Sequence, residues 1–341
     1  MSQLLENAYA VLLPAFATLE LDQTVMEFLE KGGASILLGE SRGEYLARTM
    51  TDERRARETE ADFHDIIQRA HRHARGNLLV AVDQELGGIQ RLHDLVTPLP
   101  SAADARQWSD ADIVARSREV ARAARKLGIN LFLAPIVDVV TGANPWLSGR
   151  HLGTQASEVS RISCAFIEGV QATGVAAAAK HFPGHPVCEL DPAEHEAIVG
   201  GSNSALQLSL GVFSDVIEHG VKAIMAGPAL VPSVDAEEPS STSRTTLALL
   251  REQMGFTGLI ISDDLDAPGI QRGRSIESVA VASISAGADL LLLSSESGLD
   301  EVARALVSAV ENGTLAEGRL AEAAARVRTL ASEFGDACSL E

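Results

Sequence analysis

The sequence has 341 residues, 46% of them hydrophobic, and a formal net charge of −19, which fits one large α/β domain with an extensive core. So acidic a balance excludes a basic surface for nucleic acid and disfavours an anionic membrane face as a partner. The start of the chain lacks the basic segment of a secretory signal and no apolar run reaches the length of a membrane span, so we expect a cytoplasmic protein.

Short apolar runs of the kind found in buried strands recur along the chain, with amphipathic stretches between them. Eight such runs can be identified, at residues 10–13, 34–38, 78–82, 130–134, 175–179, 222–226, 259–262 and 289–293. Strands of a parallel sheet covered on both faces read as continuous apolar runs of this length. Eight of them alternating with helices favour a (β/α)8 barrel, a TIM barrel, over an open doubly wound sheet. Because no linker or long repeat interrupts the pattern, we expect a single domain over residues 1–341.

The helical stretches carry recognisable start and stop signals. Residues 109–127 begin with Ser109 as a candidate N-cap, have acids in the first turn and bases in the last, and are followed by Gly128. Comparable patterns occupy residues 158–173, 204–218, 275–286 and 296–312. A final helix at residues 315–334 is expected to close the outer ring of the barrel.

Charged and other polar residues follow four of the apolar runs. They are Asp83, Gln84, Glu85 and Arg91 after the third run, Asp138, Asn144 and Arg150 after the fourth, Lys180 and His181 after the fifth, and Asp263 and Asp264 after the seventh. In a (β/α)8 barrel the carboxyl ends of all strands meet at one rim, where function sits. The sequence therefore predicts that these side chains converge on one site.

The residue types at this rim suit a sugar or polyol. Arg and Lys donate hydrogen bonds to hydroxyl oxygens, Asp accepts them, and a remaining carboxylate can face the anomeric carbon. Asp263 is the best candidate for a nucleophile, because the apolar run LIIS before it places it on a dry and fixed wall. Asp264 should point to the other side of the strand, where we expect a structural role.

The stretch KHFPGHPVCELDPAEH, residues 180–195, adds a Pro-rich loop with further titratable groups. These are His185, Glu189, Asp191, Glu194 and His195. The loop also contains Cys188, which we interpret as a bystander thiol. Cys164, Cys188 and Cys338 are odd in number and form no CxxC pair, so neither a disulfide framework nor a zinc site is predicted.

Several segments of the sequence resemble glycoside hydrolase family 3, in particular its single-domain branch of β-N-acetylhexosaminidases. The matching segments, in the order found in the family, are VDQELGGIQR at 82–91, GINLFLAPIVDV at 128–139, NPWLSGRHLG at 144–153, KHFPGH at 180–185, KAIMAG at 222–227, PSSTS at 239–243, LREQMGFTGLIISDDL at 250–265 and AGADLLLL at 286–293. They extend over most of the chain.

The resemblance implies a (β/α)8 barrel and a retaining, double-displacement mechanism on a small-molecule or oligosaccharide glycoside. Asp263 matches the family nucleophile in its SDDL motif. The residues that would line the subsite for the nonreducing-end sugar are Asp83, Arg91, Arg150, Lys180 and His181. The resemblance implies no metal and no organic cofactor.

The acid/base loop departs from the family pattern. In the hexosaminidase branch KHFPGH continues into GDTxxDSH, whose Asp and His form the acid/base dyad. In this chain Asp191 keeps the place of the dyad Asp, whereas Ala193 stands in the place of the dyad His. Since a general acid contributes roughly 10²–10⁴ in rate, the identity of the proton donor becomes the main question.

Three answers to that question are open. His195 could take the dyad's place, or Glu194 or Glu189 could act as a carboxylic acid whose pKa is raised by burial. We favour Glu194 and His195 over Glu189. Alternatively, the leaving group needs no proton, or the chain binds a sugar without hydrolysing it. A glycoside phosphorylase is a further alternative, although the acidic charge is unfavourable to an anionic acceptor.

Overall fold

The computed structural model describes residues 2–335, so Met1 and residues 336–341, including Cys338, lie outside the described part. Eight parallel strands form one sheet in the order β10-β1-β2-β3-β4-β5-β6-β9. Their bounds are β1 Leu12–Phe16, β2 Ser35–Leu38, β3 Leu79–Val82, β4 Leu131–Phe132, β5 Ala176–Phe182, β6 Ala223–Ala226, β9 Leu259–Ile261 and β10 Leu291–Ser294. A parallel bridge between Ile261 and Leu290 joins the last strand to the first, and the sheet closes into a barrel. The predicted (β/α)8 fold is confirmed.

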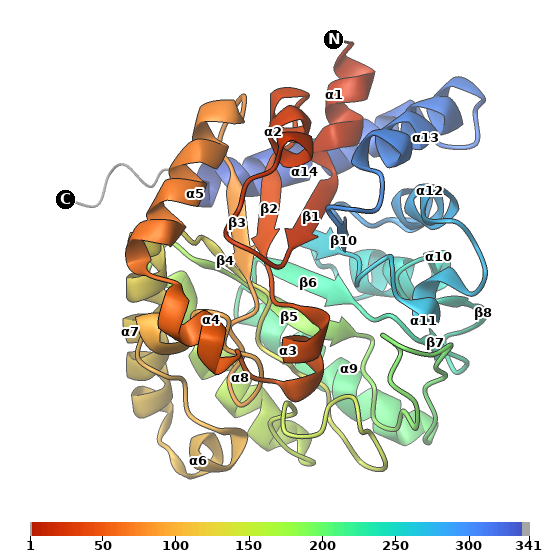
Figure 1. Ribbon diagram of the computed structural model, residues 1–341. Helices are drawn as coiled ribbons and strands as arrows, with labels where there is room; N and C mark the ends of the chain where they lie inside the picture. Colours follow the sequence, from red (N-terminus) through yellow and green to blue (C-terminus); the bar gives the residue numbers. More distant parts are fainter. Residues whose placement is uncertain (1, 336–341) are drawn as a thin grey trace.

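Helices surround this barrel, as Figure 1 shows. The described helices are α1 Gln3–Ala10, α2 Gln23–Glu30, α3 Arg42–Ala47, α4 Asp52–Arg57, α5 Glu60–His73, α6 Ala102–Gln107, α7 Asp110–Leu127, α8 Ala156–Gln171, α9 Asn203–Glu218, α10 Arg244–Ala248, α11 Pro268–Gln271, α12 Ile276–Ala286, α13 Leu299–Glu311 and α14 Glu317–Gly335. A small antiparallel pair, β7 Leu230–Val231 and β8 Asp235–Pro239, lies outside the barrel. Among residues 2–335, no helix is both long and apolar enough to span a lipid bilayer.

Local sequence signals set the helix ends. The side chain of Ser109 accepts a hydrogen bond from the N–H of Asp112 and caps α7, and Gly128 ends that helix with φ of 98°. The helix expected at residues 296–312 begins instead at Leu299. The carboxylate of Asp266 accepts the N–H of Ser294, and Ser294 accepts the N–H of Glu296, so this stretch forms a turn before the helix.

The strand ends explain how the rim is built. β5 is buried at every position and runs three residues beyond the expected end at Ala179, so Lys180 and His181 are held by the strand itself. The segment after the short β4 continues beside it, with the N–H of Val137 donating to the carbonyl of Lys180 at 2.7 Å. This pairing places Asp138 next to His181. Small alanines in β5 leave the barrel interior to larger side chains from neighbouring strands.

Candidate active site

A cavity of about 610 Å³, which we call the rim cavity, lies among residues that follow the barrel strands. Six of the side chains selected from the strand ends line it, namely Asp83, Arg150, Lys180, His181, Asp263 and Asp264. The volume suits a monosaccharide with part of its aglycone. The convergence predicted from the sequence is therefore present for these residues.

One wall of the rim cavity is a compact group of alternating charges. The Nζ atom of Lys180 lies 2.6 Å from Oδ1 of Asp83 and 2.8 Å from Oε1 of Glu85. Arg150 grips the same Glu85 with two hydrogen bonds of 3.0 and 2.6 Å. Burial by itself would raise the pKa of Glu85, but Arg150 and Lys180 outweigh it and hold that pKa well below its ordinary value. Glu85 thus fixes both cations for a ligand.

Asp138 orients two histidines beside this wall. Its buried carboxylate accepts hydrogen bonds from the backbone N–H and the Nδ1 of both His181 and His185, at 2.8–3.0 Å. Because a carboxylate only accepts, each ring must carry a proton on Nδ1. Burial lowers the pKa of His181 although Asp138 opposes the shift, so the ring is neutral at neutral pH and its Nε2 is an acceptor.

Asp263 projects from the end of β9 with one oxygen committed and one free. Its Oδ1 accepts the N–H of Asp264 at 2.8 Å, and its own N–H donates to the hydroxyl of Ser241 at 2.9 Å. The Oδ2 atom is buried without a hydrogen-bond partner and lies 4.0 Å from Nε2 of His181. A carboxylate held in this way has a fixed geometry and an oxygen available for attack. Asp264 lines the cavity as well, so the expectation that it points to the other side of the strand is wrong, and its Oδ1 accepts the N–H of Asp266.

Two aromatic side chains that the sequence reasoning did not select complete the site. Trp146 lies against His181 with 4.4 Å between ring centroids, and its indole N–H donates to the hydroxyl of Tyr45 at 2.8 Å. Both residues line the rim cavity. Trp146 lies within the quoted segment NPWLSGRHLG, which was the available signal for it, whereas nothing around Tyr45 pointed to the site.

Glu40 was also missed, although the same strand-end argument would have found it. It comes two residues after Leu38, the last residue of β2, and lines the rim cavity. The four runs that point to the rim are each followed by several charged or polar residues. A lone carboxylate after a glycine did not stand out.

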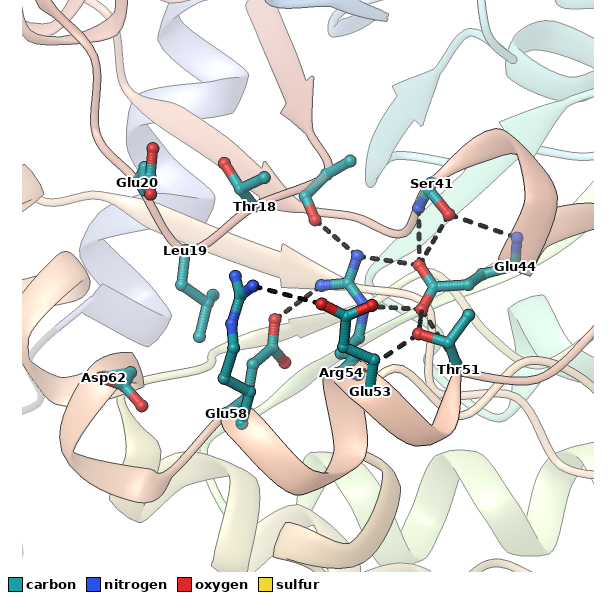
Figure 2. Close-up of a pocket in the computed structure, with 12 residues that line it drawn as sticks. Thr18, Leu19, Glu20, Ser41, Glu44, Thr51, Glu53, Arg54, Glu58 and Asp62 are labelled. Atoms are coloured by element: carbon teal, nitrogen blue, oxygen red, sulfur yellow. Dashed lines mark hydrogen bonds and ion pairs between the residues drawn. The ribbon is translucent and has the colours of Figure 1, made fainter.

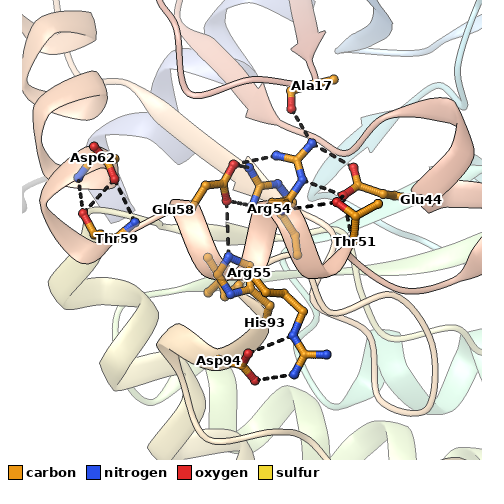
Figure 3. A network of polar contacts seen from close by, with 12 residues as sticks. Ala17, Glu44, Thr51, Arg54, Arg55, Glu58, Thr59, Asp62, His93 and Asp94 are labelled. Atoms are coloured by element: carbon orange, nitrogen blue, oxygen red, sulfur yellow. Dashed lines mark hydrogen bonds and ion pairs between the residues drawn. The ribbon is translucent and has the colours of Figure 1, made fainter.

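Arg91 lies outside the rim cavity lining. It is fully buried, donates from Nε to the carbonyl of Gly39 at 2.5 Å, and forms two hydrogen bonds with Glu58. Glu58 in turn contacts Arg54 and His93, and Arg54 continues to Glu44 (Figure 3). Arg91 thus supports the backbone just before Glu40, and a direct contact with a sugar remains a prediction.

The loop at residues 186–195 places its candidate donors at different depths. Ala193 lines the rim cavity, whereas Glu189, Glu194 and His195 are exposed. Asp191 is partly buried and does not line the cavity, and its Oδ2 lies 3.7 Å from Nη2 of Arg48. The structure therefore brings Asp263 together with the sugar-binding candidates, and it does not bring these four side chains into the cavity.

Helix α3 holds this loop in place. Arg42 donates to the carbonyl of Ala193 at 3.1 Å and lies 3.4 Å from the carboxylate of Glu194. On the other side, the N–H of Gly269 donates to the carbonyl of Pro192 at 3.0 Å. Figure 1 shows α3 on the side of the barrel to which the arrowheads of β1 and β2 point. These contacts with Arg42 and Gly269 hold the loop at the edge of the rim cavity.

A second, more polar cavity of about 380 Å³ lies between α4 and the segment that follows β1. Figure 2 shows Arg54 in its wall, hydrogen-bonded to Glu44, with Glu20, Glu53 and Asp62 around it. It shares Ala17, Thr18 and Glu20 with the rim cavity. The partly buried guanidinium of Arg54 is already paired with the carboxylates of Glu44 and Glu58, so it has no free charge for a ligand.

Among the described residues, Asp138, His181 and His185 form the one group whose spacing would admit a metal ion. The atoms that face one another there are the carboxylate oxygens and the Nδ1 atoms, at hydrogen-bond distance. Hydrogen bonds account for this geometry, so the group serves to orient the two rings.

Comparison with known proteins shows to which family this barrel belongs. The model of the glycosyl hydrolase family 3 N terminal domain matches residues 23–330. A beta-hexosaminidase of Methylococcus capsulatus is 30% identical over 269 residues, which cover 75% of this chain and 78% of that protein. A beta-N-acetylglucosaminidase/beta-glucosidase of Cellulomonas fimi is 30% identical over 271 residues, but the match covers only 48% of that protein.

Solved structures agree in fold. A family 3 beta-N-acetylglucosaminidase from a Paenibacillus species superposes with a TM-score of 0.86 at 27% identity, over 98% of this chain and 63% of that one. The chain thus spans somewhat less than two thirds of the Paenibacillus protein. A beta-N-acetylhexosaminidase from Beutenbergia cavernae has the same fold, with a TM-score of 0.86 at 24% identity and 99% of its length covered. The chain belongs to glycosyl hydrolase family 3, a family of β-glycoside hydrolases.

Proposed function

We propose that this protein, as one barrel domain, is a retaining, exo-acting hydrolase of β-N-acetylhexosaminides with Asp263 as its nucleophile. The observation that carries the proposal is the free, buried Oδ2 of Asp263 in a cavity whose opposite wall presents Asp83, Arg150 and Lys180. The names of the Methylococcus and Paenibacillus relatives support the substrate class.

In the proposed reaction the nonreducing sugar binds against the charged wall. Lys180 and Arg150 donate to its hydroxyl oxygens and Asp83 accepts from a hydroxyl. The Oδ2 atom of Asp263 attacks the anomeric carbon while the bond to the leaving oxygen breaks, and that oxygen takes up a proton. Water then attacks the same carbon, loses a proton and releases the sugar and the free carboxylate.

We propose that the proton comes from the 186–195 loop, from Glu194 first and His195 second. Ala193 already lines the cavity and its neighbour Glu194 pairs with Arg42, which lines it too. Rotation of Glu194 away from Arg42 would carry its carboxyl toward the cavity mouth. Catalytic hydrogen bonds of this kind often form only with substrate bound. Asp191 would stay in place to support the loop through Arg48.

The nucleophile can be tested by covalent trapping. A 5-fluoro glycosyl fluoride of N-acetylglucosamine, which keeps the 2-acetamido group and loses fluoride when the carboxylate attacks, should label Asp263, detected by mass spectrometry of the digested protein. Asp263→Asn should abolish labelling and reduce kcat by about 10³ or more. The exposed Glu237→Gln serves as a control and should behave like the wild type. Full activity in the Asp263→Asn variant would disprove the assignment.

A second candidate function is a sugar-binding protein without turnover. The observation that favours it is the position of Glu194 and His195, which the structure leaves outside the cavity. Aryl glycosides with a good and a poor leaving group separate the two functions. Binding without turnover of either substrate supports the binding protein, whereas turnover of both supports the hydrolase. Turnover of the good leaving group alone would show an active nucleophile without a donor.

A further inference from the structure

Glu40 lines the rim cavity in an unusual state. Its side chain is partly exposed, yet its Oε2 atom is buried and has no hydrogen-bond partner. Buried polar atoms in folded proteins are nearly always paired. An unpaired carboxyl oxygen in the wall of a ligand cavity is therefore an atom that a ligand can satisfy.

The charges around Glu40 are already paired with one another. Asp83 and Glu85 share Lys180, and Glu85 is also bound by Arg150. Arg91, the remaining cation nearby, donates to the carbonyl of Gly39 and to both oxygens of Glu58. Glu40 is thus the carboxyl on this wall without a counter-charge of its own.

These surroundings keep a proton on Glu40. Burial, followed by the carboxylates of Asp83 and Glu85, raises the pKa of Glu40 to about 8, against the opposing charges of Arg91 and Lys180. At neutral pH the side chain is mainly a carboxylic acid. It then has a hydroxyl that donates and a carbonyl that accepts, whereas Asp83 only accepts and Lys180 only donates.

We propose that Glu40 is a specificity-determining residue whose carboxylic acid donates a hydrogen bond to one hydroxyl oxygen of the bound sugar, next to Asp83. The inference rests on the proposed function, because it takes the rim cavity as the sugar site. A sugar hydroxyl both donates and accepts, so a single hydroxyl can donate to Asp83 and accept from Glu40. The pair therefore selects sugars with a free hydroxyl at the position that faces it.

The placement of Glu40 separates this role from that of the general acid. Its charged neighbours are Asp83, Glu85 and Arg91, which follow β3, and Lys180 on β5. Asp83, Glu85 and Lys180 belong to the charged wall of the rim cavity, and Arg91 lies behind it. A proton donor for the leaving group must instead reach the glycosidic oxygen at the cavity mouth, where the 186–195 loop lies.

The experiment compares Glu40→Ala and Glu40→Gln with the wild type on a 4-nitrophenyl N-acetyl-β-glucosaminide. Glu40→Ala should lose about 10–100-fold in kcat/KM, mostly through KM, and Glu40→Gln should recover most of this loss because an amide still donates. In the wild type kcat/KM should fall above pH 8 as Glu40 ionises, and Glu40→Gln should lack that step. Glu237→Gln is the matched control at an exposed site and should be unchanged.

Deoxy substrates locate the hydrogen bond. Among the 3-, 4- and 6-deoxy analogues, one should bind wild type and Glu40→Ala equally, because the contact is missing in both cases. Equal losses in Glu40→Gln and Glu40→Ala would show that an ionised carboxylate is required and would overturn the proposal. Wild-type behaviour of Glu40→Ala would also overturn it.

Labelling of Asp263 keeps the two proposals apart. If the 5-fluoro glycosyl fluoride labels the wild type and Glu40→Ala with equal efficiency, the hydrolase stands and the role of Glu40 fails. If no label forms but calorimetry shows that binding of N-acetylglucosamine weakens in Glu40→Ala and recovers in Glu40→Gln, the role of Glu40 stands and the hydrolase fails.

Discussion

The Nε2 atom of His181 lies 4.0 Å from Oδ2 of Asp263 in the lining of the rim cavity. With Nδ1 donating to Asp138, Nε2 is unprotonated and faces another acceptor. Two acceptors at this distance do not bond to each other, but both can accept from one substrate group. The relationship depends on Asp138, which fixes the tautomer and the orientation of the ring.

The first prediction concerns Asp138→Asn. The amide has one acceptor oxygen where the carboxylate has two, so it cannot satisfy all four donors that now meet Asp138. The free energy of unfolding should fall by about 3 kcal/mol, because buried donors lose their acceptor. Urea denaturation measures this loss, and kcat should fall as His181 loses its orientation. Asp215→Asn on the outer helix α9 is the control and should change stability by less than ~0.5 kcal/mol.

The second prediction is a gain of function. Ala193→His restores the residue type that the family resemblance places in the dyad, beside Asp191 and in the cavity wall. The variant should hydrolyse an aryl glycoside with a poor leaving group about 10-fold or more faster than the wild type, because a general acid matters most there. Rates on an activated leaving group should change little. Ala193→Gln, a polar side chain without a basic site, should give no gain, and a gain in both variants would contradict the proton-transfer explanation.

A third prediction concerns stability in acid. Burial by itself would raise the pKa of Glu58, but hydrogen bonds from His93 and Arg91 outweigh burial and lower this pKa to about 2. A carboxyl whose pKa is depressed on folding stabilises the protein fully above its ordinary value of 4.5, and this contribution is lost as the pH falls toward 2. Glu58→Gln should therefore lower the midpoint temperature of thermal unfolding at pH 7. The difference in this temperature between the variant and the wild type should shrink between pH 4.5 and 2. Glu53→Gln, an exposed change on α4, the helix that Glu58 follows, should show no such pH dependence.

A fourth prediction tests the close approach of Gly227 to His185. A Cβ at Gly227 would lie 2.2 Å from Cε1 of His185 and 3.2 Å from the carbonyl oxygen of Phe182. His185 cannot turn away without breaking its hydrogen bonds to Asp138. Gly227→Ala should therefore cost about 1–3 kcal/mol in urea denaturation. Gly211→Ala in α9, where the added Cβ meets nothing within 4 Å, should be neutral or stabilising by up to ~1 kcal/mol.

The barrel could be predicted from the sequence because each strand is a short apolar run between helices with clear caps. All eight predicted runs overlap barrel strands, and the end of β5 lies at Phe182 because the chain after β4 continues to pair with it. The start of α13 could not be predicted. It depends on Asp266, a residue far away in sequence that binds the turn before the helix.

The site could be predicted where charged residues directly follow a strand, as for Asp83, Lys180 and Asp263. The sequence does not distinguish a side chain that lines the cavity from one that is buried behind the cavity wall. Arg91 and Arg150 look alike in sequence, yet Arg91 is paired with Glu58 on α4's side and Arg150 reaches the cavity. Such distinctions depend on the path of α3 and α4, two short helices without a strong periodic pattern.

The chain of ion pairs that runs from Glu44 through Arg54 and Glu58 to Arg91 ends on the carbonyl of Gly39, the residue before Glu40. These ion pairs connect α3 and α4 to the backbone beside Glu40, the residue that we propose donates to a sugar hydroxyl. If the proposal for Glu40 holds, changes at position 54, which does not line the rim cavity, should alter substrate preference, and a search for selectivity variants that is confined to cavity residues would overlook them.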